Sequence, residues 1–213
     1  ALNEKAQYRF QMTPQSVLED RPVSYPLTRA MCAPIGDGAA AALLCSKEYL
    51  EKLPAAVKER AVKVAGVGFS GGKYRKLDEP GLTRAASDKA YKMAGLGPED
   101  IDVAEVHDAT SFCEIYQCEM LRFCPEGEGG RFIASGATGP GGKLPVNTSG
   151  GLVSKGHPVG ATGLSMLAEL ATQLRGEAGP RQVKGAEIAL AENGGGVIGM
   201  EEAVASVVIL QKV

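Results

Sequence analysis

The chain has 213 residues, of which 44% are hydrophobic and 23% charged, and its formal net charge is -2. This is an ordinary composition for a globular protein with a sizeable core, and it gives no electrostatic footprint for nucleic acid. No apolar run approaches the roughly 20 residues of a membrane span, and neither end of the chain carries a secretory or peroxisomal address.

The cysteines favour a reducing compartment. Their number is odd, no CxxC spacing occurs, and the chain begins without a secretory signal. We therefore expect a cytoplasmic protein with reduced thiols and no structural zinc or other metal. The five residues are Cys32, Cys45, Cys113, Cys118 and Cys124.

The first 60 residues carry too few elements for a complete domain. Thr13 followed by Pro14 predicts a helix start. The segment GDGAAAALLCS, residues 36–46, is small and apolar and predicts a buried strand. A polar helix over KEYLEKLPAAVKER follows, and Pro54 predicts a break near Leu53.

Residues 62–124 alternate between strands and helices. VKVAGVGF predicts a strand, SGGKYRKLDEPG a surface loop, and LTRAASDKAYKMAGL a helix stopped by Gly95 and Gly97. The alternation in VAEVHDA predicts a second strand. SFCEIYQCEMLRF predicts a helix whose apolar stripe consists of Phe112, Ile115, Tyr116 and Met120.

The rest of the chain begins with a glycine-heavy segment, residues 125–163, which is too long for a plain connector and so points to function. EIALAE and AVASVVILQ predict two strands that are antiparallel neighbours. The order of elements predicts an α/β layered domain with a mixed sheet. ATGLSMLAELATQLRG predicts a helix with a stripe of Leu164, Leu167, Leu170, Ala171 and Leu174.

The two histidines occupy similar places. His107 follows a strand and precedes a helix, and His157 lies among glycines just before the clearest helix. Strand ends and helix starts are where α/β sheets bind ligands, and an imidazole there can polarise a carbonyl or take a proton from a thiol. The pattern favours an active site, with two buried structural histidines as the alternative.

Three other glycine-rich stretches need separate interpretations. GATGPGGKL and GVGFSGGKY lack the spacing and the Ser or Thr of a phosphate-binding P-loop. LAENGGGVIG is either a tight turn with Glu192 as a solvated strand end, or a loop that contacts a substrate with Glu192 at its rim.

Several motifs together resemble the thiolase superfamily. NTSGGLVSKGHPVGATG resembles the signature around the Gly-His-Pro histidine, and VHDATSF resembles the second catalytic loop in its His-Asp, sterol-carrier-protein form. ENGGG falls where the third loop, usually Cys-x-Gly, would be. PLTRAMCAPIGDGAAAALL resembles the end of the amino-terminal thiolase half, so the resemblance covers essentially the whole chain.

The resemblance implies a fold of two similar halves. Residues 1–60 would be the tail end of the amino-terminal half and residues 61–213 the carboxy-terminal domain, a mixed five-stranded sheet with helices on both faces. It also implies an acetyl-CoA acetyltransferase-like enzyme of lipid metabolism. Such an enzyme makes or breaks a carbon–carbon bond beside a thioester, with coenzyme A as substrate and no permanently bound cofactor.

The resemblance assigns roles by position. His157 would activate the nucleophilic thiol and help bind the thioester oxygen, and His107 would replace the usual Asn that holds a water there. The Gly194 backbone N–H would serve the second oxyanion. The glycines expected to line the coenzyme A ester are Gly150, Gly151 and Gly156.

The sequence departs from the thiolase pattern at the acid/base cysteine. The gap-free match places Glu192 there, and we predict that it acts as the acid/base, because a desolvated carboxyl can have a pKa near neutral. In the sterol-carrier form a cysteine of the His-Asp loop can move this proton, but here that position is Ala109. Cys113, one turn later, is a weaker substitute.

None of the five cysteines lies in a context that resembles the nucleophile loop, and Cys32 has the context of a core residue. We therefore expect the chain alone to be inactive and to need the missing amino-terminal half or a second polypeptide. Two alternatives stay open: an aldolase that cuts a β-hydroxyacyl-CoA, and a non-catalytic acyl-CoA-binding subunit.

The resemblance also implies partners. Thiolases of this kind commonly form homo-oligomers through the amino-terminal half. Those of the His-Asp type often work with a small partner that carries an OB-fold and a zinc ribbon. We expect neither nucleic acid nor a membrane as a partner.

Overall fold

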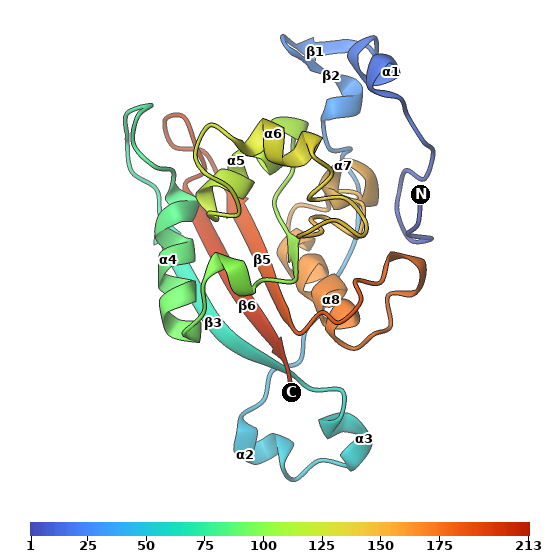
Figure 1. Ribbon diagram of the computed structural model, residues 1–213, viewed down its shortest axis with the longest axis vertical. Helices are drawn as coiled ribbons and strands as arrows, with labels where there is room; N and C mark the ends of the chain where they lie inside the picture. Colours follow the sequence, from blue (N-terminus) through green and yellow to red (C-terminus); the bar gives the residue numbers. More distant parts are fainter.

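A computed structural model describes residues 1–213 and has a four-stranded mixed sheet at its centre (Figure 1). The order across the sheet is β3-β6-β5-β4, with β4 parallel to β5 and the other pairs antiparallel. The predicted strands are therefore present, and the two last ones are antiparallel neighbours as predicted. Their bounds are Val62–Gly71 (β3), Val103–Glu105 (β4), Ile188–Gly195 (β5) and Val204–Lys212 (β6).

The prediction of five strands is wrong by one, because the chain beside β4 does not continue as a strand. Ala104 makes a single parallel bridge with Val146. Asn147 follows with a φ of 56°, a left-handed conformation that turns the backbone away from the sheet. The outer edge of β4 is thus paired at one residue only.

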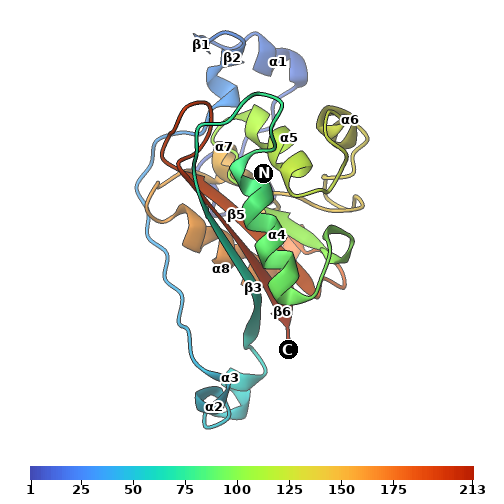
Figure 2. The same ribbon diagram turned by 90° about the vertical axis from the view of Figure 1, so that its left-hand side faces the viewer.

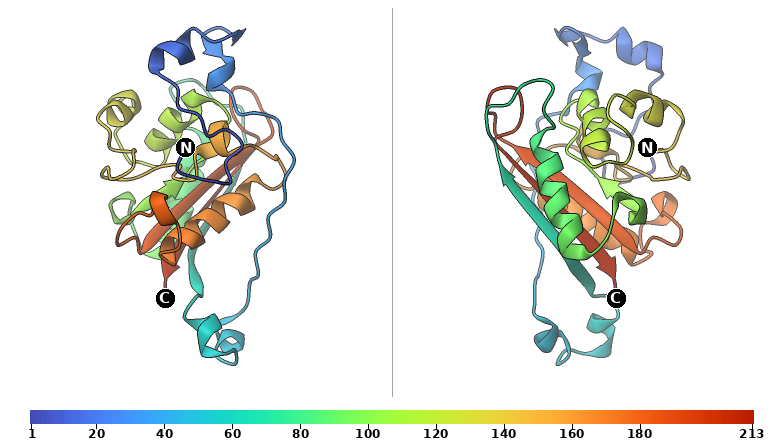
Figure 3. Two further views of the ribbon diagram at one scale, coloured as in Figure 1. Left: turned by 90° about the vertical axis from the view of Figure 1, so that its right-hand side faces the viewer. Right: turned by 60° about the vertical axis from the view of Figure 1, so that its left-hand side comes forward.

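Helices cover both faces of the sheet, as expected for this α/β class (Figure 3). Helix α4, Leu82–Ala94, packs on β3 and β6, and α8, Thr162–Leu174, packs mainly on β5. Gly95 ends α4 as predicted, with a φ of 69°. Gly68 of β3 allows α4 to approach closely, since a Cβ there would lie 1.8 Å from the Ala86 carbonyl oxygen.

Two helices bury only part of the apolar stripes that the sequence predicts, together with residues outside those stripes. In α5, Ser111–Met120, the buried residues include Gln117 and Cys118, whereas Phe112 is 59% exposed. In α8 the inward apolar residues are Met166, Leu170 and Leu174, and Leu164 is exposed. Both helices bury hydrogen-bonded glutamines, Gln117 and Gln173, and a count of apolar residues alone misses this contribution to the buried face.

The glycine-heavy segment contains two short helices, α6 (Gly129–Ala134) and α7 (Gly151–Lys155). Three 3₁₀ turns occur elsewhere: η1 (Arg29–Met31), η2 (Pro98–Asp100) and η3 (Gly179–Arg181). No helix is both long enough and apolar enough to cross a membrane.

The elements of residues 1–60 lie above and below the central sheet in Figure 1, while the first residues of the chain lie beside α7, where Gln7 and Tyr8 donate their backbone N–H groups to the carbonyl oxygens of Lys155 and Ser154. Thr13 caps the first helix by accepting the Ser16 N–H, and the predicted break at Pro54 separates α2 from α3. The elements are α1 (Pro14–Leu18), β1 (Pro22–Ser24), β2 (Leu27–Thr28), α2 (Lys47–Leu50) and α3 (Ala55–Lys58).

The buried strand predicted at residues 36–46 is wrong. This segment runs along one side of the molecule without a strand neighbour (Figure 2), and the Leu43 side chain is fully exposed. A strand needs a second strand to accept and donate its backbone hydrogen bonds, and no other segment of the chain lies beside this one in that way.

Candidate functional site

The fold brings the two histidines together. His107 lies two residues beyond β4, and His157 lies between α7 and α8. Their ring centroids are 5.1 Å apart, and the ring planes meet at 62°. Two side chains that are 50 positions apart in the sequence therefore form one edge-to-face pair at the end of the sheet where β4 finishes.

The orientation of His157 follows from a hydroxyl at the start of α8. Thr162 Oγ1 lies 2.8 Å from His157 Nδ1 and 3.2 Å from the Pro158 carbonyl oxygen. Because the hydroxyl donates its only proton to that carbonyl, it accepts the Nδ1 proton of the imidazole. This assignment leaves a lone pair on Nε2, which is the state that a general base requires.

Both imidazoles are neutral at pH 7. Burial, with His157 as a smaller second cause, lowers the pKa of His107 to about 4. Burial also lowers the pKa of His157. Neutral rings can each donate one hydrogen bond and accept another, so the pair is able to bind a carbonyl oxygen and to take up a proton.

Glu192 lies beneath this pair on β5 and is fully buried, which excludes the interpretation as a solvated strand end. Its Oε2 accepts the backbone N–H of His107 at 3.0 Å, and its Oε1 accepts the Thr83 hydroxyl at 3.3 Å. Burial raises its pKa to about 8, and Glu202 adds a smaller repulsion. The carboxyl therefore contacts the backbone of His107 rather than either imidazole.

The next residues of β5 alternate between the two faces of the sheet. Gly194 pairs with Ala205 of β6, and a Cβ on it would lie 2.6 Å from Glu202 Cγ, on the face that Glu192 also shares. Asn193 points to the α8 face, where its Cγ is 3.5 Å from the position of a Cβ on Gly163. Asn193 Oδ1 is buried without a hydrogen-bond partner.

Asn193 is not among the site residues predicted from the sequence. The signal that would have found it is the alternation of side chains along a strand, counted from Glu192. A buried carbonyl oxygen without a donor is costly, and such atoms often mark functional sites.

The three glycines predicted to line a coenzyme A ester define the ends of α7. Gly150 precedes the helix with a φ of 104°, and Gly156 follows it with a φ of 114°. Gly151 has a φ of 62°, and a Cβ there would lie 2.2 Å from Asp108 Oδ2. The local backbone thus already requires these glycines, and their contact with coenzyme A stays a prediction.

A cleft of about 420 Å³ lies next to the His157 loop. Its walls are residues 36–40 on one side and residues 158–161 on the other. The cleft is lined mostly by backbone and small side chains, which permits a ligand to approach the backbone closely.

The cysteines lie in different environments: Cys45 is exposed, and Cys32 is partly buried and bridges to Thr110. Cys113 is in the first turn of α5, with its Sγ 3.2 Å from Thr110 Oγ1. Cys118 and Cys124 are buried, and burial raises the pKa of Cys124 to about 11 and that of Cys118 still further. Buried thiols with such pKa values are poor nucleophiles.

Comparisons with known proteins agree with this architecture. Residues 76–212 match the family described as thiolase C-terminal domain-like. Sterol carrier protein 2 of Rattus norvegicus is 40% identical over 209 residues, which is 90% of this chain and 36% of that protein. An acetyl-CoA acetyltransferase of Methanothermobacter thermautotrophicus is 43% identical over 201 residues, 92% of this chain and 52% of that protein.

Among solved structures, the Ltp2-ChsH2(DUF35) aldolase superposes on the whole chain with a TM-score of 0.83 and 26% sequence identity, covering 55% of that chain. The chain spans about a third to a half of the length of the curated relatives it matches. The matched domain, the shared architecture and the identity of about 40% to these relatives show that the chain belongs to the thiolase superfamily.

Proposed function

We propose that the protein acts on a coenzyme A thioester as a thiolase-type acyltransferase that cleaves a 3-ketoacyl-CoA with a thiol or runs the reverse condensation. The observation that carries the proposal is the pair of neutral imidazoles 5.1 Å apart, with Nε2 of His157 free to accept a proton. Cleavage next to a thioester needs a base for the thiol and donors for the carbonyl oxygens that become negative.

In the proposed step, one histidine transfers the proton and both histidines stabilise the oxyanion. His157 Nε2 takes the thiol proton, and the thiolate attacks the 3-keto carbon. The bond between the α- and β-carbons breaks, and its electron pair becomes the enolate of the departing thioester. His157, now with a proton on Nε2, and His107 would donate hydrogen bonds to that enolate oxygen, directly or through a water.

Glu192 is the proposed acid/base that protonates the enolate carbon. Its pKa of about 8 supports this role, because a carboxyl with that pKa carries a proton at neutral pH and can release it. Its contact with the His107 backbone also positions the loop that bears the imidazole. The Gly194 N–H is the proposed donor to the second oxyanion.

The nucleophilic thiol of this reaction is proposed to come from outside these 213 residues. The cysteine in the helix that follows the second loop, Cys113, has its Sγ 3.2 Å from the Thr110 hydroxyl. An amino-terminal thiolase half, in the same chain or in a second polypeptide, would supply the attacking sulfur and close the cleft beside residues 36–40. Coenzyme A would act as a substrate rather than as a bound cofactor.

A second candidate function is an aldolase acting on a β-hydroxyacyl-CoA. It is favoured by the likeness to the Ltp2-ChsH2(DUF35) aldolase and by Glu192 and Asn193 standing in the third loop, where a cysteine would serve a thiolase. In that reaction His157 Nε2 would take the β-hydroxyl proton, and the α–β bond would break to a carbonyl compound and a thioester enolate. No attacking thiol is required.

Partners follow from the same relatives. The name Ltp2-ChsH2(DUF35) aldolase pairs that protein with a second polypeptide. We propose that this chain likewise works with a partner subunit, such as a small protein with an OB-fold and a zinc ribbon, within a homo-oligomer.

The test compares two substrates with the protein that carries this chain and its amino-terminal half. Consumption of free coenzyme A with a 3-ketoacyl-CoA, lost in His157→Gln, would establish the thiolase. Release of a carbonyl product from a β-hydroxyacyl-CoA without thiol consumption would establish the aldolase. Turnover that survives His157→Gln, or none with either substrate, would contradict both.

A further inference from the structure

The segment that leads into α7 is fastened to the strand and loop that carry His107. Ser149 donates its N–H and its hydroxyl to the two oxygens of Glu105, at 3.0 and 2.6 Å. Val106 donates its N–H to Asn147 Oδ1 at 2.9 Å. The two residues before His107 therefore bind two residues of the segment that leads into α7.

Asp108 makes the contact that holds the first turn of α7. Its Oδ1 accepts the N–H of Leu152 at 2.6 Å, and the residue is 5% exposed. Gly151 fits against its other oxygen, since a Cβ at this residue would lie 2.2 Å from Oδ2. Burial raises the pKa of this carboxyl well above its ordinary value, and a carboxyl oxygen accepts well at this end of a helix, where backbone N–H groups have no partner within the helix.

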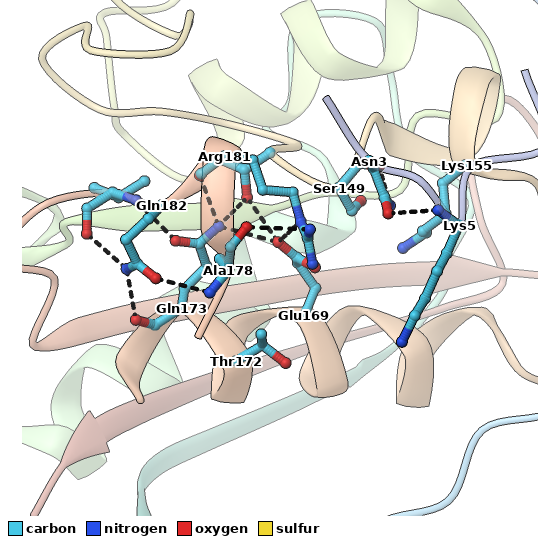
Figure 4. Close-up of polar contacts among 12 residues, drawn as sticks. Asn3, Lys5, Ser149, Lys155, Glu169, Thr172, Gln173, Ala178, Arg181 and Gln182 are labelled. Carbon is cyan, nitrogen blue, oxygen red and sulfur yellow. Dashed lines mark hydrogen bonds and ion pairs between the residues drawn. The ribbon is translucent and has the colours of Figure 1, made fainter. Parts of the chain in front are cut away.

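The opposite side of the segment is held by α8 and by the start of the chain. Thr148 bonds Glu169 at 3.4 Å and Gln173 at 3.2 Å. Asn3 donates to the Ser149 carbonyl at 2.8 Å (Figure 4). These bonds support residues 148 and 149. Two side-chain contacts join the region of His107 to α7 itself: Asp108 holds the first turn, and Glu105 Oε2 accepts a hydrogen bond from Lys155 Nζ at 3.4 Å at the last residue of the helix.

We propose that Asp108 is a positioning residue that sets the separation of the His107 and His157 rings by holding the first turn of α7. The inference rests on the proposed function, in which both rings act on one thioester oxygen. A five-residue helix is not stable by itself, so its place depends on such tertiary contacts. Asp108 is adjacent to His107, and α7 ends at Lys155, two positions before His157, so a shift of its first turn moves the chain that carries the second ring.

The test replaces Asp108 and observes the histidine rings by NMR, with the two signals assigned through His107→Gln and His157→Gln. In Asp108→Ala we expect the nuclear Overhauser contact between the rings to be lost. The pKa of His107 should rise from about 4 towards its ordinary value of about 6.5 as the loop opens to water. Asp108→Asn keeps an acceptor oxygen and should restore both readouts.

The matched control is Asp102→Ala. Asp102 also accepts backbone N–H groups, those of Glu187 and Ile188 at 2.8 and 2.9 Å, but at the other end of β5. The Asp102→Ala substitution should lower the melting temperature and leave the NMR signals of both histidine rings unchanged. The inference would be overturned if Asp108→Ala left the ring NMR signals and the pKa of His107 at their wild-type values. It would also be overturned if Asp102→Ala changed them as much as Asp108→Ala does.

If Asp108→Ala does not fold, Asp108→Glu carries the test, because the added methylene displaces the acceptor while the carboxyl group is kept. Displaced ring signals support the inference, and unchanged signals overturn it. Turnover of the thioester is measured in parallel, with an expected fall in kcat/KM of roughly 100-fold for a misplaced ring. A wild-type protein without thioester turnover would contradict the proposed function, while the ring measurements would still decide the role of Asp108.

Discussion

Thr162 Oγ1 lies 2.8 Å from His157 Nδ1 and donates its own proton to the Pro158 carbonyl. The first turn of α8 thereby selects the imidazole tautomer with a free lone pair on Nε2. A hydroxyl that is 1% exposed has no water to replace either bond, so the choice of tautomer is built into the start of the helix.

Thr162→Val should lower kcat by roughly 10- to 100-fold with little change in KM, because the isosteric side chain removes the acceptor of the Nδ1 proton. Thr162→Ser keeps the hydroxyl and should retain most of the activity. Steady-state kinetics and the ¹⁵N shifts of the His157 ring measure the two effects. A valine variant with wild-type ring shifts and rate would show that Thr162 does not select the tautomer.

Glu192→Gln should slow turnover by roughly 100-fold if Glu192 is the acid/base, because the amide keeps the size of the side chain but cannot transfer a proton. A positioning role alone would be largely preserved, since the amide oxygen can still accept the His107 N–H. Near-normal turnover in this variant would therefore exclude the acid/base role. The pH–rate profile should lose its limb near pH 8 in the variant.

The same substitution should change how stability depends on pH. The folded-state pKa of Glu192, about 8, lies above the unfolded value of about 4.3, so the folded protein binds the extra proton between these values. Stability from this group is complete below about pH 4.3 and is lost as the pH rises towards 8. The melting temperature of Glu192→Gln relative to wild type should therefore be higher at pH 8 than at pH 5.

Asn193→Ala should leave stability within about 1 kcal/mol of wild type, because Oδ1 has no hydrogen bond to lose and Nδ2 makes only a long one, 3.4 Å, to the Gly194 carbonyl. If the amide serves substrate at the α8 face, kcat/KM should fall by about 10-fold or more. Thermal unfolding and kinetics on one preparation separate the two effects. Loss of stability without loss of activity would make Asn193 a structural residue.

Gly68→Ala should destabilise the fold by about 3 kcal/mol, because its Cβ would lie 1.8 Å from the Ala86 carbonyl oxygen and force α4 away from β3. Gly71→Ala, on the same strand, is the control, since no atom lies within 4 Å of its Cβ position. Denaturant unfolding of both variants measures the difference. Equal stabilities would contradict the close approach of α4 to the sheet.

Local signals in the sequence predicted most of the elements correctly. Thr13 and Pro14 begin α1, Pro54 separates α2 from α3, and Gly95 ends α4, because capping and the loss of a backbone N–H act within a few residues. The strand predicted at residues 36–46 failed for the opposite reason. An extended apolar segment becomes a strand only when another strand lies beside it, and that is not a local property.

The sequence by itself determined the family and the two histidines, because the Gly-His-Pro and His-Asp motifs are contiguous and the alternation of strands and helices is visible in hydrophobic periodicity. Only the tertiary structure decided what these residues do to one another. It set the rings of His107 and His157 5.1 Å apart, buried Glu192 beneath the His107 backbone and turned Asn193 to the other face. These relationships join residues 30 to 85 positions apart, and such contacts arise from packing across the sheet rather than from the chemistry of neighbouring residues.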